Sequence, residues 1–325
     1  MDTFLLYLDE WPWIFTISIA AFLSFDYWRL PDLTIESAFT AGMASVFIAS
    51  TKGSNGGQFL AFLILLFLGI PAFLSFVTWS LSLLRFPSLF AGLVVTLGAY
   101  TLNFKLNGGQ TSQEIHVNWP QVLNFTSLDK SARFYLLALL LALVMAVIVG
   151  VFATRRIGFR IFLARRTIEP VVSESIGING SLATFVAMIV YNLIAFTGGV
   201  GFALTSSQTS VSMLGAIIPG LACMFILRAI RGLLAAPASG MLQKKRRSSV
   251  SWLIQRSDSI WMLLAGLALL SAVTAALRMT ARNAAHGVAM LNAYTAIGIL
   301  VVWVLVSFVG YLMGKRISSN SNADF

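Results

Sequence analysis

The chain has 325 residues, of which 58% are hydrophobic and 10% are charged, and its mean hydropathy is +0.85. Because a soluble domain is about 45–50% apolar and about 25% charged, this composition excludes a soluble globular enzyme, and it equally excludes a disordered chain. The apolar runs are long and unbroken, unlike the alternating segments of about 10 residues that build a membrane barrel. The sequence therefore predicts an all-α, polytopic transmembrane helical bundle.

The net charge of +10 comes from 22 Lys and Arg against 12 Asp and Glu. In a membrane protein such an excess reflects basic cytoplasmic loops, so we expect membrane lipid and no nucleic acid as a partner. The single cysteine, Cys223, allows no internal disulfide and no cysteine-based metal site. Since the sequence also has no glycine-rich phosphate loop and no nucleophile–base pattern, we expect no metal, no cofactor and no enzymatic activity in this chain.

Nine apolar segments organise residues 1–325 as a single transmembrane domain, and most of them reach the ~20 residues that a spanning helix needs. They cover 11–25, 33–50, 59–79, 86–104, 134–154, 181–203, 211–230, 258–279 and 290–313. The first has about 15 residues and would rise only about 22 Å, and the second begins directly after Pro31. We therefore expect a short or broken helix near residues 26–37, with a broken or re-entrant pair in place of two full spans.

Basic residues predict the orientation of these segments. The connections 155–180 and 228–257 are rich in Arg and Lys, which places both in the cytoplasm. Alternation along nine segments then puts the N-terminus outside and the C-terminus inside. This arrangement leaves 16 of the 22 Lys and Arg on the cytoplasmic side.

Nearly every charged residue falls at the end of a predicted segment, and the exception is the stretch after Pro31. Proline cannot continue a preceding helix, so Asp32 stands where a helix N-cap belongs, and Thr34, Glu36 and Ser37 fall in the first turns. Broken helices of this kind often mark transport sites. The alternative is a capped helix start at the cytoplasmic surface without a substrate role, and both interpretations stay open.

Small residues predict where helices approach closely. Segment 33–50 is dense in Gly, Ala, Ser and Thr, and segment 181–203 contains Gly198, Gly199 and Gly201. In lipid, such residues allow helix backbones to come near one another.

The cytoplasmic stretch 163–176 is a short amphipathic segment, with Val171, Val172 and Ser175 on one face at helical spacing and Gly177 as a stop. It could rest on the membrane interface or fit into a groove of a partner protein.

Three segments, in this order, resemble the permease subunits of ABC importers of the branched-chain amino acid and ribose type, and among them the tryptophan/tyrosine-type permease components. Residues 30–39 are similar to the family's PDLTV(D/E)GSF element, with Ser37 where the family has glycine. Residues 91–105 are similar to AGILTMTALYSINLR. Residues 156–179 are similar to the stretch that ends in ALGIN, although 167–170 replace its GDNP-like turn.

The resemblance implies the membrane-spanning subunit of an ATP-driven importer in the bacterial cytoplasmic (inner) membrane. Such subunits work as dimers, often homodimers, with the path for a small organic solute, here favoured to be amino acid-like, between the two copies. ATP and Mg²⁺ would be bound by a separate ATP-binding subunit, and an external substrate-binding protein would deliver the solute. The candidate residues of the translocation path are Asp32, Thr34, Glu36, Ser37, Tyr100 and Asn103. The candidate contacts of the coupling segment with the ATP-binding subunit are Arg165, Arg166, Glu169, Pro170, Val171 and Glu174.

An ion-coupled secondary transporter of a small solute is the alternative. It requires a proton- or ion-binding group at the middle of the bilayer, and from the sequence Glu36 is the one candidate, close to a helix start.

Overall fold

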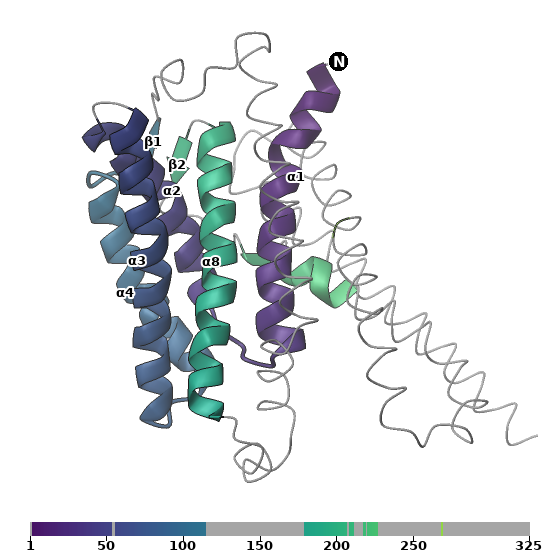
Figure 1. Cartoon of the computed structure of the whole chain (residues 1–325). Helices are drawn as coiled ribbons and strands as arrows, with labels where there is room; N and C mark the ends of the chain where they lie inside the picture. The colour runs from purple at the N-terminus through teal and green to yellow at the C-terminus, as the bar shows by residue number, and fades with distance from the viewer. Residues whose placement is uncertain are drawn as a thin grey trace, which may run out of the picture.

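A computed structural model describes a large part of the chain: residues 2–53, 56–114, 179–206, 208–210, 217–218, 220–226 and 268. This part is helical apart from one small two-stranded ribbon (Figure 1). The elements are α1 (Asp2–Ala21), the π-helix η1 (Phe22–Tyr27), α2 (Thr34–Lys52), α3 (Gly56–Leu83), α4 (Ser88–Leu106), β1 (Ser112–Glu114), α8 (Gly180–Ser206) and β2 (Gln208–Ser210).

Three helices are long and apolar enough to cross a membrane: Gly57–Leu83, Ser88–Leu106 and Gly180–Leu204. They confirm the third, fourth and sixth predicted segments and are compatible with a transmembrane protein. Four of the other six expected segments lie wholly or largely outside the described residues, namely 134–154, 211–230, 258–279 and 290–313.

The expected break after the first segment is confirmed. The chain stays helical through α1 and η1, where Trp28 N donates to Leu23 O at 2.9 Å in a π-type bond, and helical structure resumes only at Thr34. Arg29 has the left-handed φ of 54°, a conformation that ends a right-handed helix. The apolar helix Pro12–Tyr27 is shorter than a full span, and α2 is not among the three spanning helices.

Side-chain contacts fix the relative directions of the helices. Thr34 of α2 lies against Asn192 of α8 and Phe39 lies against Gly199, so these two helices are parallel. On α3, Trp79 bonds Ser181 and Phe67 stacks on Phe196, so α3 runs antiparallel to α8. These directions agree with the predicted alternation, in which one further segment, 134–154, comes between α4 and α8.

Helix α2 forms the centre of the bundle, next to α8, α3 and α4. Thirteen of its 19 residues are buried, against five of 19 in α4. Its small residues permit this, as predicted: a Cβ placed on Gly42 would lie 2.2 Å from Phe196 O, and one placed on Gly199 would lie 1.8 Å from Phe39 O. The backbones of α2 and α8 are therefore in direct contact.

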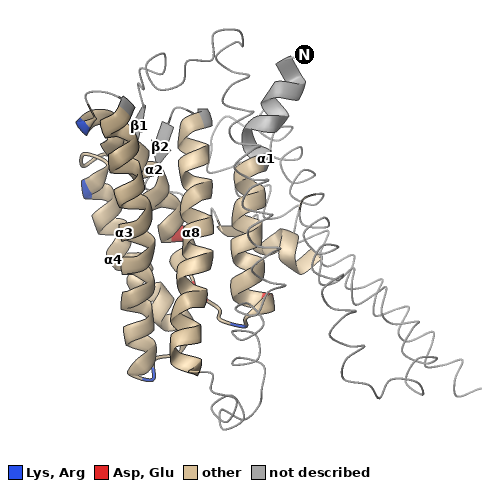
Figure 2. Ribbon diagram, in the orientation of Figure 1, with Lys and Arg blue, Asp and Glu red and all other residues tan. Residues whose placement is uncertain are grey.

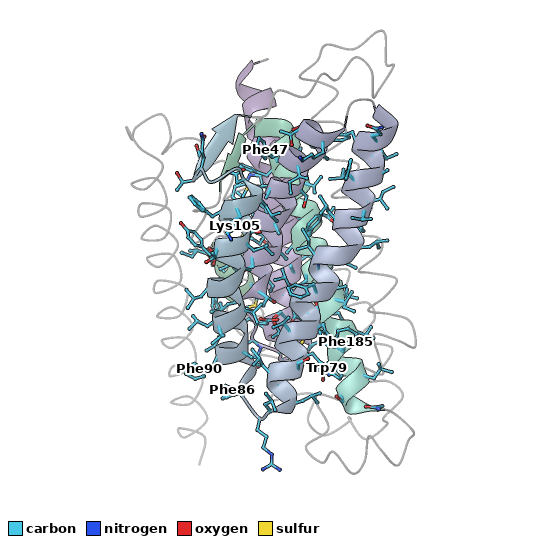
Figure 3. The ribbon with its side chains drawn as sticks, turned by 90° about the vertical axis from the view of Figure 1, so that its left-hand side faces the viewer. Phe47, Trp79, Phe86, Phe90, Lys105 and Phe185 are labelled. Carbon is cyan, nitrogen blue, oxygen red and sulfur yellow. The ribbon has the colours of Figure 1, made fainter. Side chains whose placement is uncertain are left out.

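The outer surfaces of α3 and α4 are apolar. Phe73 is 58% exposed and Leu97 is 64% exposed, and Figure 3 shows Phe86 and Phe90 at the edge of the bundle. The described basic residues lie toward the helix ends, with Lys52 in the last turn of α2 and Lys105 in that of α4 (Figure 2). This distribution is typical of helices in contact with lipid.

The ribbon of β1 and β2 was not predicted. The two strands pair antiparallel, with Gln113 opposite Thr209. Because β1 follows α4 and β2 follows α8, the ribbon joins the ends of two parallel helices on the same side of the bundle.

Candidate functional site

The break before α2 lies level with the middle of α8. The hydroxyl of Tyr191 donates to Asp32 Oδ2 at 2.5 Å. Tyr191 is 11 residues beyond the start of the 25-residue span Gly180–Leu204, which corresponds to about 16 Å of helix. Asp32 therefore lies inside the helical bundle, level with the middle of α8.

The sequence predicts Asp32 as the N-cap of α2, whereas the structure places the N-cap one residue later, at Leu33, whose side chain makes no capping bond. Asp32 nevertheless satisfies a free backbone N–H of the first turn. Asp32 Oδ1 accepts a hydrogen bond from Thr34 N at 2.9 Å, the bond that an N-cap residue makes. The side chain of Asp32 is fully buried, so this bond lies in the protein interior.

Neutral side chains from three helices surround the Asp32 carboxylate. Thr34 Oγ1 lies 2.7 Å from Asp32 Oδ2 and 3.2 Å from Asn192 Oδ1. Since one hydroxyl carries one proton, Thr34 donates to the nearer partner, Asp32 Oδ2. Asn192 Nδ2 in turn donates to Ser75 Oγ on α3 at 3.0 Å. We call Asp32, Thr34, Ser75, Tyr191 and Asn192 the Asp32 cluster; all five are buried, each with zero exposure.

Helix α4 covers the other side of the break. A Cβ placed on Gly92 would lie 2.2 Å from Asp32 Oδ1 and 2.8 Å from Leu33 N, so only glycine fits there. Thr96 Oγ1 donates to Leu33 O at 3.1 Å. The α4 backbone thus closes the pocket around the carboxylate.

A second polar contact joins α2 and α4 two turns further on. Asn103 Nδ2 donates to Thr40 Oγ1 at 2.7 Å and lies 3.4 Å from Ser37 O. Asn103 is 2% exposed and Ser37 is 3% exposed. Ser37 and Thr40 of α2 are thereby hidden from the apolar exterior.

The structure divides the six candidate path residues into two groups. Asp32, Thr34, Ser37 and Asn103 are buried and hydrogen bonded within the subunit. Glu36 is half-buried on α2, and Tyr100 is 40% exposed on α4. The six candidate coupling residues, Arg165, Arg166, Glu169, Pro170, Val171 and Glu174, lie outside the described residues.

Sequence reasoning missed Ser75, Tyr191 and Asn192. A signal for two of them exists, since Tyr191 and Asn192 are adjacent polar residues at the centre of an apolar segment, where polar side chains are rare. Their pairing with Asp32 and Thr34 could not be read, because 159 and 158 residues separate the bonded partners.

The cluster directs hydroxyl and backbone N–H donors at a single carboxyl group. A buried polar group of this kind is costly unless it is hydrogen bonded. Among the residues that the structure describes, no group of three His, Cys, Asp or Glu could hold a metal ion.

Comparisons with protein families, with curated proteins and with solved structures find no match to this chain.

Proposed function

We propose that this chain is the permease subunit of an ATP-driven ABC importer, and that two copies form the translocation path for a small organic solute, with amino acid-like solutes favoured. The observation that carries the proposal is the polar break before α2, at the level of the middle of α8. The ordered resemblance of residues 30–39, 91–105 and 156–179 to such permeases supports it.

The non-helical segment before α2 requires a physical explanation, because it is level with the middle of α8. Non-helical backbone within a membrane is tolerated only where protein covers it or where it lines a cavity, and discontinuous helices often surround transport sites. Here Trp28, Leu30 and Asp32 are buried. Buried contacts thus stabilise a helix break that would otherwise be unfavourable within a membrane, as expected of a functional element.

The proposed partners follow from the sequence. An ATP-binding subunit would dock on the cytoplasmic segment 163–176 and bind ATP and Mg²⁺. An external substrate-binding protein would deliver the solute. In this orientation, within a bacterial cytoplasmic membrane, the N-terminus is outside and the C-terminus is cytoplasmic.

One observation favours a second candidate, an ion-coupled secondary transporter. The sequence offered only Glu36 as a coupling group, near a helix start. That helix start is level with the middle of α8, and the Asp32 carboxyl group lies four residues before Glu36. Buried carboxylates in such positions often serve proton or ion coupling.

One reconstitution separates the two functions. The full chain is placed in proteoliposomes with and without a candidate ABC ATP-binding subunit, and uptake of a mixture of labelled amino acids is measured. An ABC permease requires the partner and ATP, and a partner variant without its phosphate-loop lysine should abolish uptake. Uptake by this chain alone, driven by a proton or sodium gradient, would overturn the proposal in favour of the second candidate.

A further inference from the structure

We infer that the polar residues of α2 have two roles: the Asp32 cluster, with Tyr191 and Asn192 as positioning residues, holds the broken helix start in place, whereas Glu36 and Tyr100 on the α4 side contact the solute. This inference rests on the proposed transport function and assigns roles within the same site.

The Asp32 cluster has no room for a solute. Three hydrogen bonds from Thr34 and Tyr191 occupy the carboxylate. The backbone at Gly92 lies against its Oδ1 atom. A solute could reach Asp32 only if α4 or α8 moved away.

Helix α8 is poorly suited to such a movement. At Gly42 and Gly199 its backbone touches that of α2, and close-packed interfaces do not deform continuously. Tyr191 and Asn192 therefore belong to a fixed interface, and they act on the solute only through the position of α2.

The α4 side places Glu36 beside Tyr100. The two contacts between these parallel helices, Leu33 with Thr96 and Thr40 with Asn103, have the same offset of 63 residues. With this register Glu36 lies opposite Ala99, a small residue that leaves space for it, and Tyr100 is the next residue along α4.

Both side chains retain accessible surface in the single subunit. Tyr100 is 40% exposed and Glu36 is half-buried. The neighbouring outer residues of α4 are apolar, Leu97 at 64% and Leu102 at 40% exposure. A glutamate at this depth is costly toward hydrocarbon, and an aqueous path would hydrate its accessible part. A carboxylate beside a phenol suits the ammonium group of an amino acid-like solute.

Thiol labelling tests the assignment without any partner protein. In a Cys223→Ser background, Glu36→Cys and Ser75→Cys are compared in proteoliposomes containing the full chain, using a charged, hydrophilic thiol reagent. We expect Glu36→Cys to react at least about tenfold faster, because a thiol within the Asp32 cluster reacts only after local opening. Equal rates would overturn the inference, whatever energy source drives transport.

Transport kinetics test the two roles. Per assembled complex, Glu36→Gln should raise the KM for uptake by about fivefold or more, because a charged contact is lost, with little change in thermal stability. Tyr191→Phe should lower the melting temperature and leave the KM nearly unchanged. The fall in melting temperature caused by Tyr191→Phe should be much smaller in an Asp32→Asn background, since both changes break the same contact.

Thr197→Val is the matched control. It removes another buried hydroxyl of α8, one that bonds Leu193 O of its own helix at 2.7 Å, and should alter neither KM nor labelling. A raised KM in Tyr191→Phe with an unchanged KM in Glu36→Gln would reverse the assignment. If uptake proves independent of ATP, the proposed function fails, whereas the labelling and KM results still decide the two roles.

Discussion

The two sides of α2 are held in different ways. Toward α8, glycines bring the backbones into contact, and a buried carboxylate joins α2 to Tyr191. Toward α4, the contacts are hydroxyl and amide hydrogen bonds at Thr96 and Asn103, with one close approach at Gly92. The comparison indicates that α2 and α8 form a fixed unit, and that the α4 side is the one that can adjust to a solute.

The largest expected effect comes from filling the α2–α8 contact. In Gly199→Ala the new Cβ would lie 1.8 Å from Phe39 O, so the helices must separate. We expect a loss of about 3 kcal/mol or more in stability, measured as thermal unfolding of the purified chain in detergent. Gly98→Ala on α4, where a Cβ meets nothing within 4 Å, should leave stability unchanged or raise it by up to about 1 kcal/mol, because alanine favours the helix more than glycine does. Similar melting temperatures for the two variants would contradict direct backbone contact.

The second largest expected loss of stability comes from removing the side chain of Asp32. Asp32→Ala leaves the Tyr191 hydroxyl and the Thr34 N–H without their acceptor in a buried site, so we expect a loss of about 2–4 kcal/mol. Asp32→Asn keeps one acceptor oxygen and should lose less stability than Asp32→Ala. The same unfolding assay orders the two variants. A loss of only about 1 kcal/mol in Asp32→Ala, as for an exposed N-cap, would place Asp32 at a surface.

Removing the hydrogen bond between α2 and α4 should reduce the free energy of unfolding by less than removing the Asp32 carboxyl group. Asn103→Leu keeps the approximate volume and removes the bond to Thr40, and polar contacts between membrane helices contribute about 0.6–1.7 kcal/mol. Thermal unfolding should show a smaller loss than in Asp32→Ala. A larger loss would mean that α4, and not α8, fixes the position of α2.

The smallest expected change in stability is that of Tyr100→Phe. The ring is 40% exposed and keeps its apolar contacts, so we expect a change of less than about 0.5 kcal/mol. The KM for uptake should nevertheless rise if the hydroxyl contacts the solute. An unchanged KM would remove Tyr100 from the path and leave Glu36 as the remaining contact.

The sequence predicted the features that local chemistry determines. Pro31 indicated the break, and the glycines of α8 indicated close packing. The lengths of the apolar runs indicated nine segments, three of which are spanning helices in the described part of the chain. The π-helix η1 and the pairing of Ser75, Tyr191 and Asn192 with α2 could not be predicted, because they depend on the register between helices far apart in the chain. For the same reason, Asp32 and Glu36 could not be assigned to different faces from their spacing alone.

The most direct test of a solute path beside the broken start of α2 is uptake per assembled complex in Glu36→Gln. We expect the KM to rise by at least about fivefold, equivalent to ~1 kcal/mol of lost solute interaction, while the amount of complex and its melting temperature stay close to those of the unmodified protein. A KM and a maximal rate per complex equal to those of the unmodified protein would contradict a solute path at this face of α2.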